Sequence, residues 1–206
     1  WPAFGKVEYC RIGTDVDLQW HNRLYGRLIH REFPSTRNAI VNSIMRRHLD
    51  GRAFINDPDV FLLRHTNTTL TLDQRKTLFY VNMLFGNLFF TSDDIREYTI
   101  EERELFLSAF SMQTKRILWA EFDAGLCVAR FVSGPREFFF ISNVSGRART
   151  VRIPPGGRYI LLGERVDESK LDMAAFESSK GLPLYAGGSK LRLRAYRTKC
   201  LLCLER

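Results

Sequence analysis

The stretch LFFTSDDIREYTIEE, residues 88–102, carries the pattern that predicts the fold of the first half of this chain. Its first four residues have the length and apolar character of a short strand. The acidic pair Asp93-Asp94 follows, and Thr99-x-x-Glu102 is a capping box, which predicts a helix running to about Met112. A strand, a polar loop and a helix, in this order, form the repeating unit of a parallel sheet.

Two earlier segments repeat this order. The first has a predicted strand at Lys6–Ile12 and then a helix that Ser35 can cap, running to about Leu49. The second has a predicted strand at Ala53–Ile55, and the capping box Thr71-x-x-Gln74 opens a helix to about Asn87. Three such units are too few for a stable sheet covered on both faces, so we expect further strands before the start of this chain.

From Lys115 onward, short strand-like runs and turns that contain Gly or Pro replace the helices. This change predicts an antiparallel β-sandwich domain over residues 113–206. The polar stretch Asp167–Ser189 carries no pattern that predicts a helix or a strand. The predicted strands are Leu118–Glu121, Leu126–Phe131, Glu137–Asn143, Thr150–Ile153, Tyr159–Leu162, Leu191–Tyr196 and Cys200–Leu204.

The net charge of +8 at first suggests nucleic-acid binding. Residues 1–110, however, hold 14 basic and 14 acidic residues, whereas residues 111–206 hold 17 basic and 9 acidic ones. The excess follows predicted strands at every second position, for example Lys190, Arg192 and Arg194, which is typical of the solvated face of a sheet. We therefore expect no nucleic-acid partner, and the lack of an 18-residue apolar run predicts no membrane span.

Four cysteines include the pair Cys200-x-x-Cys203, whose spacing raises the question of a zinc or redox site. A structural zinc needs four ligands, and no second such pair lies nearby. Residues three apart in a strand point to opposite faces, so buried thiols are the favoured interpretation. Free thiols favour a reducing compartment, so we expect a cytoplasmic protein. No pair of His residues has the spacing of metal ligands, so we expect no metal, and no cofactor is expected either.

Pairs of carboxylates follow the three predicted strands of the first half. In a β/α barrel the active site forms at these strand ends, and carboxylates there can accept hydrogen bonds from sugar hydroxyls. For the last pair, helix capping or loop bracing is the favoured interpretation, because Asp is common just before helices. The pairs are Asp15 with Asp17, Asp57 with Asp59, and Asp93 with Asp94.

Three motifs in the same order resemble those of the α-galactosidases of glycoside hydrolase family 36, in clan D. They are Arg11-Ile12-Gly13-Thr14-Asp15-Val16 followed by Trp20, then residues 56–64 and residues 86–94. The resemblance covers about residues 1–110. It implies that residues 1–112 form the C-terminal part of a catalytic (β/α)8 TIM barrel and that the following β domain is similar in type.

The resemblance also implies roles for single residues. Asp15 matches the general acid/base, and Arg11 matches the arginine that holds sugar hydroxyls near the scissile bond. Asp59 matches an acidic residue that borders the sugar pocket, and the ring of Trp20 is expected on the leaving-group side. We therefore expect Arg11 and Asp59 to face the same cleft as Asp15, the alternative being that Arg11 only pairs with a nearby acid.

The motifs contain further polar residues besides those with assigned roles. Asp17 is the rival for the acid/base role, because residues two apart in an extended chain point the same way. Asn56 and Asp57 are interpreted as loop scaffolding. The sequence departs from the family pattern at Thr14, where Pro is usual, and at Phe54, where Trp is usual.

A retaining glycosidase needs a second carboxylate as nucleophile. In the family it lies in a Lys-x-Asp motif upstream of the acid/base. Lys170-Leu171-Asp172 matches by letters but follows the last barrel strand, so we interpret it as a chance match. The chain is thus expected to be a fragment with the acid/base but without the nucleophile, and to be inactive alone.

The predicted function is hydrolysis of terminal α-galactosyl residues from α-galactoside oligosaccharides. The alternatives are a non-catalytic carbohydrate-binding protein, an α-N-acetylgalactosaminidase or galactosyl-transferring relative, and a basic nucleic-acid binder. A nucleic-acid binder would lose affinity steeply with salt. Whether the full-length protein forms a homo-oligomer is left open.

Overall fold

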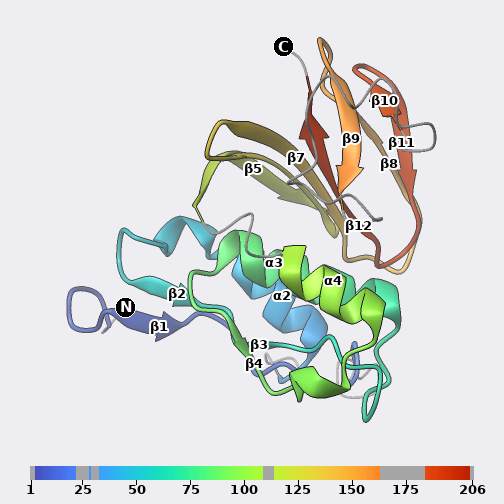
Figure 1. The fold of residues 1–206 in the computed structure, drawn as a ribbon. Helices are drawn as coiled ribbons and strands as arrows, with labels where there is room; N and C mark the ends of the chain where they lie inside the picture. Colours follow the sequence, from blue (N-terminus) through green and yellow to red (C-terminus); the bar gives the residue numbers. More distant parts are fainter. Residues whose placement is uncertain (1–2, 22–27, 29–32, 109–113, 163–183, 205–206) are drawn as a thin grey trace. The chain divides into compact units, whose positions relative to one another are not determined.

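The computed structural model of the chain describes residues 3–21, 28, 33–108, 114–162 and 184–204 (Figure 1). The chain divides into two compact units, Trp1–Arg103 and Glu104–Arg206. The boundary between the domains was predicted slightly later in the sequence, between residues 112 and 113. Each unit is described by itself.

Parallel strand pairs characterise the first unit. β1 (Tyr9–Arg11) pairs with β2 (Ile55–Asp57), and β3 (Val60–Phe61) pairs with β4 (Phe90–Thr91), both in parallel. β1 and β4 are shorter than predicted, and β2 has the predicted length but begins two residues later. β2 extends to Asp57 because its register with β1 sets Arg11 opposite Asp57.

The break between β2 and β3 was not predicted. Two residues separate these strands, Pro58 and Asp59, and Asp59 has a φ of 75°. Pro has no N–H to give to a sheet, and Asp is one of the few residues that tolerate left-handed backbone. The chain therefore turns here and resumes as β3, beside β4.

The helices of the first unit begin where the sequence predicts. Ser35 caps α2 (Thr36–Met45) by accepting a hydrogen bond from the Asn38 amide, and the short 3₁₀ helix η1 (Arg47–Leu49) follows α2. Thr71 and Gln74 form the complete capping box of α3 (Leu72–Phe85).

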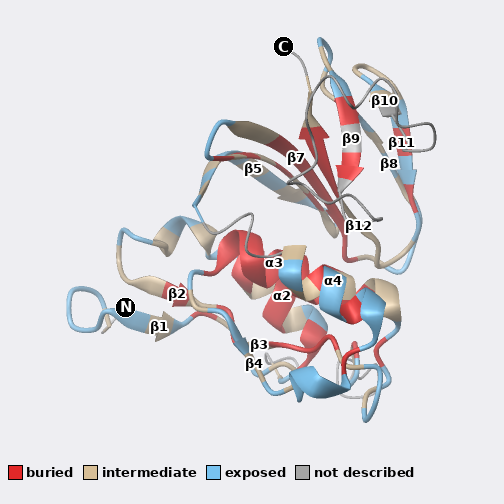
Figure 2. Cartoon of the chain, in the orientation of Figure 1, coloured by how far each residue is buried: buried red, intermediate tan, exposed pale blue. Residues whose placement is uncertain are grey.

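The core of this unit is built around α3. Most residues of α3 are buried (Figure 2). The helix packs against α2 and β3, so it carries buried residues on nearly every side. Phe79 lies edge-on to Phe61 of β3, with 5.2 Å between the ring centroids. A helix buried on nearly all sides is a core helix.

The second predicted capping box is also present. Thr99 Oγ1 accepts from the Glu102 amide at 3.2 Å, and the Glu102 carboxylate accepts from the Thr99 amide at 2.9 Å. The box opens α4 (Ile100–Ser108), which follows the 3₁₀ helix η2 (Ile95–Glu97). The remainder of the helix predicted to run to Met112 lies outside the described residues.

The second unit is antiparallel throughout its described strand pairs. A six-stranded sheet has the order β10-β9-β12-β7-β6-β5, and β11 pairs with β8 in a separate two-stranded ribbon. The strands are β5 (Lys115–Asp123), β6 (Leu126–Ser133), β7 (Arg136–Asn143), β8 (Arg149–Arg152), β9 (Arg158–Leu162), β10 (Leu184–Ala186), β11 (Lys190–Leu193) and β12 (Thr198–Cys203).

A buried apolar cluster joins the ribbon to one face of the six-stranded sheet. Leu191 and Leu193 of β11 meet Phe139 and Ile141 of β7 there. Ile153, Tyr159, Leu161 and Leu201 complete the cluster. Leu126, Val128 and Val151 are partly buried at its margin.

β10 is a strand that the sequence did not predict, since it lies inside the polar stretch Asp167–Ser189. Leu184 pairs with Ile160 of β9, and Tyr185 packs against the core cluster. Three residues carry too little local pattern, so pairing with β9 decides their conformation. Lys170-Leu171-Asp172 lies outside the described residues.

The described cysteines of this unit lie in strands, and so do Lys190 and Arg192, whereas Arg194 follows the end of β11. Cys200 is buried in β12 and Cys203 is half-buried, both as free thiols. In β11, exposed Lys190 and Arg192 alternate with buried Leu191 and Leu193. Within the described part of the chain, no group of His, Cys, Asp and Glu is arranged to hold a metal, and no helix could cross a membrane.

Candidate active site

A single guanidinium gathers three carboxylates at the ends of β1 and β2. Arg11 Nη1 lies 3.2 Å from Asp15 Oδ1 and 2.9 Å from Asp59 Oδ1, and Arg11 Nε lies 3.1 Å from Asp57 Oδ2. The structure thus brings together Arg11, Asp15 and Asp59. Arg11 forms an ion pair with each of these acids, which is compatible with both expectations for Arg11.

The parallel register of β1 and β2 positions this cluster. Arg11 stands opposite Asp57, and the Ile12 amide donates to the Asp57 carbonyl at 3.0 Å. Both strands run in the same direction, so their C-terminal ends meet at one edge. The loop that carries Asp15 and the turn that carries Asp59 leave the strands at this edge.

Asp59 links the turn after β2 to the loop after β1. Its side chain is only 9% exposed, and its Oδ2 accepts a hydrogen bond from the Val16 amide at 2.7 Å. The Asp59 amide donates to Asp57 Oδ1 at 2.9 Å, and Asn82 of α3 donates to the Asp59 carbonyl at 3.2 Å. Asp59 therefore holds the residue next to Asp15 in place.

Asp15 and Asp17 differ in how their carboxylates are used. The side chain of Asp15 is 78% exposed and touches Arg11. Asp17 instead accepts from the Leu18 amide at 2.7 Å and from Gln19 Nε2 at 3.1 Å. These bonds commit Asp17 to its own turn, whereas the carboxylate of Asp15 faces solvent beside a cation.

The electrostatics of the cluster keep Arg11 charged. Burial by itself lowers the pKa of Arg11, but the hydrogen bond to Asp57 and the negative charges of Asp59, Asp57 and Asp15 outweigh it, so the pKa is raised above its usual value. Arg11 is 40% exposed, and its Nη2 atom takes no part in the three ion pairs. It can therefore donate to a ligand while the acids hold it in place.

Contacts with α2 and with Arg46 at its C-terminal end restrain the loop after β1. Arg46 donates to the Ile12 carbonyl, and Thr36 Oγ1 donates to the Asp17 carbonyl at 2.5 Å. A Cβ on Gly13 would lie 3.2 Å from the Asn42 Cβ, so α2 and the loop approach each other closely here. Thr14, which stands where the family has Pro, is thus in a loop that other contacts restrain.

Trp20 is 9% exposed, so most of its side chain is buried, and its carbonyl accepts from the Arg37 amide at 3.0 Å. This burial suits a packing role for most of the ring. Its expected contact with the leaving group stays a prediction. The neighbouring His21 lies 3.4 Å from Ser35 at the start of α2.

Asn56 and Asp57 are strand residues with different tasks. Asn56 is fully buried, and its side chain donates to the Arg46 carbonyl at 3.2 Å, which agrees with the predicted scaffolding role. Asp57 binds both Arg11 and the Asp59 amide, so it belongs to the cluster. Its position in the motif did not suggest this. Only the pairing of β1 with β2 makes Asp57 the neighbour of Arg11.

The third acidic pair has structural tasks, as the sequence favoured. The side chain of Asp93 is fully buried and accepts from the Leu63 amide at 2.6 Å and from Tyr98 Oη at 2.7 Å. Asp94 caps η2 through the Arg96 amide, and the Arg96 guanidinium lowers the pKa of Asp94 to about 2. Asp93 braces the chain that follows β3, and Asp94 begins a helix.

Comparison with models of known protein families finds no match for this sequence. Solved structures, however, share its fold. A Bacteroides fragilis protein with a provisional α-galactosidase assignment matches with a TM-score of 0.65 at 13% identity, over 95% of this chain and 42% of its own. α-Galactosidase I from Mortierella vinacea matches with a TM-score of 0.64 at 10% identity, over 98% of this chain and 54% of its own.

The α-galactosidase from Saccharomyces cerevisiae, solved with raffinose, matches with a TM-score of 0.62 at 11% identity. The match covers 97% of this chain and 60% of the yeast enzyme. The chain therefore has the fold of a part of these proteins and spans about half of their length. At such low identity the likeness concerns the fold alone.

Proposed function

We propose that this chain is part of a retaining glycoside hydrolase of α-galactosidase type, related to family 36. Residues 1–112 would be the C-terminal part of the catalytic (β/α)8 barrel, and residues 113–206 a β-sandwich domain. The observation that carries the proposal is the contact of Arg11 with Asp15 and Asp59 at the ends of two parallel strands. Barrel enzymes build their active sites at such strand ends.

In this proposal Asp15 is the general acid/base. Its exposed carboxylate can reach a ligand, and it protonates the departing glycosidic oxygen and then removes a proton from the attacking water. Arg11 donates its unused N–H groups to sugar hydroxyls, while Asp57 and Asp59 orient its guanidinium. Trp20 is proposed to line the leaving-group side of the site.

The nucleophile of this proposal belongs to a part of the full-length protein outside residues 1–206. A retaining mechanism needs two carboxyl groups about 5 Å apart, on opposite sides of the anomeric carbon. Asp57 and Asp59 are already committed to Arg11 and to backbone amides, so neither is a suitable nucleophile. Residues 1–206 alone are therefore proposed to bind sugar without turning it over.

The test is the stereochemistry of hydrolysis by the full-length protein. An aryl α-galactoside should release galactose first as the α-anomer, which proton NMR distinguishes from the β-anomer. Release of the β-anomer would contradict a retaining mechanism. Binding of galactose without turnover would instead support a carbohydrate-binding protein, and preference for the N-acetylgalactosaminide would change the sugar but not the mechanism.

A further inference from the structure

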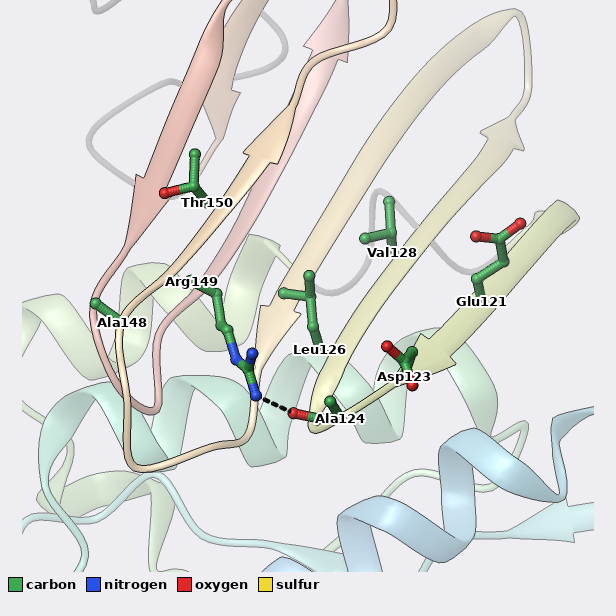
Figure 3. Close-up of a pocket in the computed structure, with 8 residues that line it drawn as sticks. All are labelled: Glu121, Asp123, Ala124, Leu126, Val128, Ala148, Arg149 and Thr150. Carbon is green, nitrogen blue, oxygen red and sulfur yellow. Dashed lines mark hydrogen bonds between the residues drawn. The ribbon is translucent and has the colours of Figure 1, made fainter.

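The second unit contains a hollow of its own, at the end of β5 and β6 (Figure 3). Its volume is about 400 Å³, at the lower end of the range of small-ligand sites, which is about 300–1,000 Å³. The residues that line it are Glu121, Asp123, Ala124, Leu126, Val128, Ala148, Arg149 and Thr150. All of them belong to β5, β6, β8 and the connecting turns.

The register of β5 and β6 determines which side chains share this face. Glu121 is opposite Val128, and Asp123 is opposite Leu126, so each carboxylate stands beside an apolar side chain. Trp119 precedes Glu121 by two residues and therefore points to the same face of β5. It is 38% exposed, and both carboxylates are exposed as well.

Arg149 forms the opposite wall. It lies on the same side of β8 as Val151, which packs against the core cluster. Its Nη2 donates to the Ala124 carbonyl at 2.7 Å, a bond that ties β8 to the turn between β5 and β6 (Figure 3). Its Nε is buried and has no hydrogen-bond partner among the residues that the structure describes. Arg149 is thus a restrained donor at the edge of the hollow.

The lining combines hydrogen-bond acceptors, a donor and an apolar floor. Glu121 and Asp123 accept hydrogen bonds, Arg149 donates them, and Leu126 and Val128 supply apolar surface. Two carboxylates and one guanidinium leave a net charge of −1, so the charges largely balance. A neutral ligand with many hydroxyl groups and an apolar C–H face matches this lining better than a cation does.

We propose that this hollow is a second carbohydrate-binding site, which takes one or two units of a neutral oligosaccharide. The ring of Trp119 contacts the C–H face of the sugar, the two carboxylates accept from its hydroxyl groups, and Arg149 donates to a hydroxyl or ring oxygen. The site needs no residue of the Arg11 cluster, so it does not depend on the proposed hydrolase activity.

The experiment is calorimetric titration of the full-length protein with raffinose, a neutral trisaccharide, in an Asp15→Ala background that prevents turnover. Among the raffinose-binding events, we expect one whose affinity falls at least tenfold in the double variant Glu121→Gln, Asp123→Asn. Trp119→Ala should weaken it likewise, while Trp119→Phe should retain most of the affinity. Glu104→Gln removes an exposed carboxylate elsewhere in the second unit and is the matched control, which should leave binding unchanged.

The remaining outcomes are distinguishable. If every raffinose-binding event survives the Glu121, Asp123 and Trp119 substitutions, the second site does not exist, and the proposed hydrolase is untouched. If the event lost in those variants is the only one, and Arg11→Met has no effect on it, the second site stands while the proposed sugar pocket fails. Binding of spermidine but not raffinose at these residues would overturn the proposal in favour of a cation site.

Discussion

Asp59 should be the carboxylate of the cluster on which folding depends, and Asp59→Ala is the change that tests this. The substitution removes the acceptor of the Val16 amide at 2.7 Å and the partner of Arg11 at 2.9 Å, from a side chain that is 9% exposed. It also places Ala at a φ of 75°, which Asp tolerates better than Ala does.

The expected loss follows from these three effects. A hydrogen bond to a charged acceptor contributes about 1.5–3 kcal/mol. Left-handed backbone costs Ala about 1 kcal/mol. The ion pair adds roughly 0–1 kcal/mol, because Arg11 is 40% exposed and keeps two other acids. Asp59→Ala should therefore lower the free energy of unfolding by about 2.5–5 kcal/mol.

Urea unfolding, followed by far-UV circular dichroism on the same protein, measures this loss as a shift of the midpoint at constant slope. Asp59→Asn is the matched variant. It keeps an acceptor for Val16 and tolerates the left-handed backbone, so it should lose only about 1 kcal/mol. Asp15→Ala should stay within about 1 kcal/mol, because its side chain is 78% exposed. Equal destabilisation by Asp15→Ala and Asp59→Ala would refute the division into a functional and a structural acid.

Three further predictions concern stability. Burial raises the pKa of Glu102, but hydrogen bonds from Thr99, Arg75 and His65 outweigh it, so the pKa is lowered. The Glu102 carboxylate therefore contributes fully to stability above about pH 4.3, and this contribution is lost as the pH falls through the folded-state pKa. Glu102→Gln should lower the free energy of unfolding by roughly 3 kcal/mol at pH 7 and make it depend less on pH in the acid range. Burial and the hydrogen bond to Asp93 raise the pKa of Tyr98, so its phenol should stay protonated in an absorbance titration past pH 10, and ordinary titration near pH 10 would count against this contact. Tyr98→Phe should lower the free energy of unfolding by about 1–2 kcal/mol. Leu193→Ala, at a fully buried position of the second core, should destabilise by about 2–5 kcal/mol in the same urea assay, and a change below 1 kcal/mol would argue against the described packing of β11.

Local signals were enough to predict much of the fold. The capping boxes at Thr71 and Thr99 place two helix starts correctly, because a cap is formed by residues three positions apart. Short strand-like runs between turns with Gly or Pro likewise predicted most strands of the second unit. β10 escaped because three residues carry little pattern, and its conformation depends on pairing with β9.

In the candidate site, too, the features that depend on nearby residues could be predicted and those that depend on strand pairing could not. The spacing of Arg11 and Asp15 is local, and the two side chains do meet. The position of Asp57 in the cluster is not local, because it depends on the parallel register that sets residue 57 against residue 11. The spacing from Arg11 and to Trp20 already favoured Asp15 over Asp17. What the spacing could not predict is that hydrogen bonds from Leu18 and Gln19 occupy the Asp17 carboxylate.

The most direct test of the central claim is a comparison of Asp15→Ala with Asp17→Ala in the full-length protein. Without its acid/base, the enzyme should lose activity on natural galactosides but retain the first step on activated aryl α-galactosides, whose leaving groups need little protonation. A covalent intermediate should then accumulate, and added azide should restore turnover, as long as Asp15 is the residue removed. Asp17→Ala should show neither effect. If Asp15→Ala keeps full activity on raffinose, or if azide rescues only Asp17→Ala, the assignment of Asp15 is contradicted.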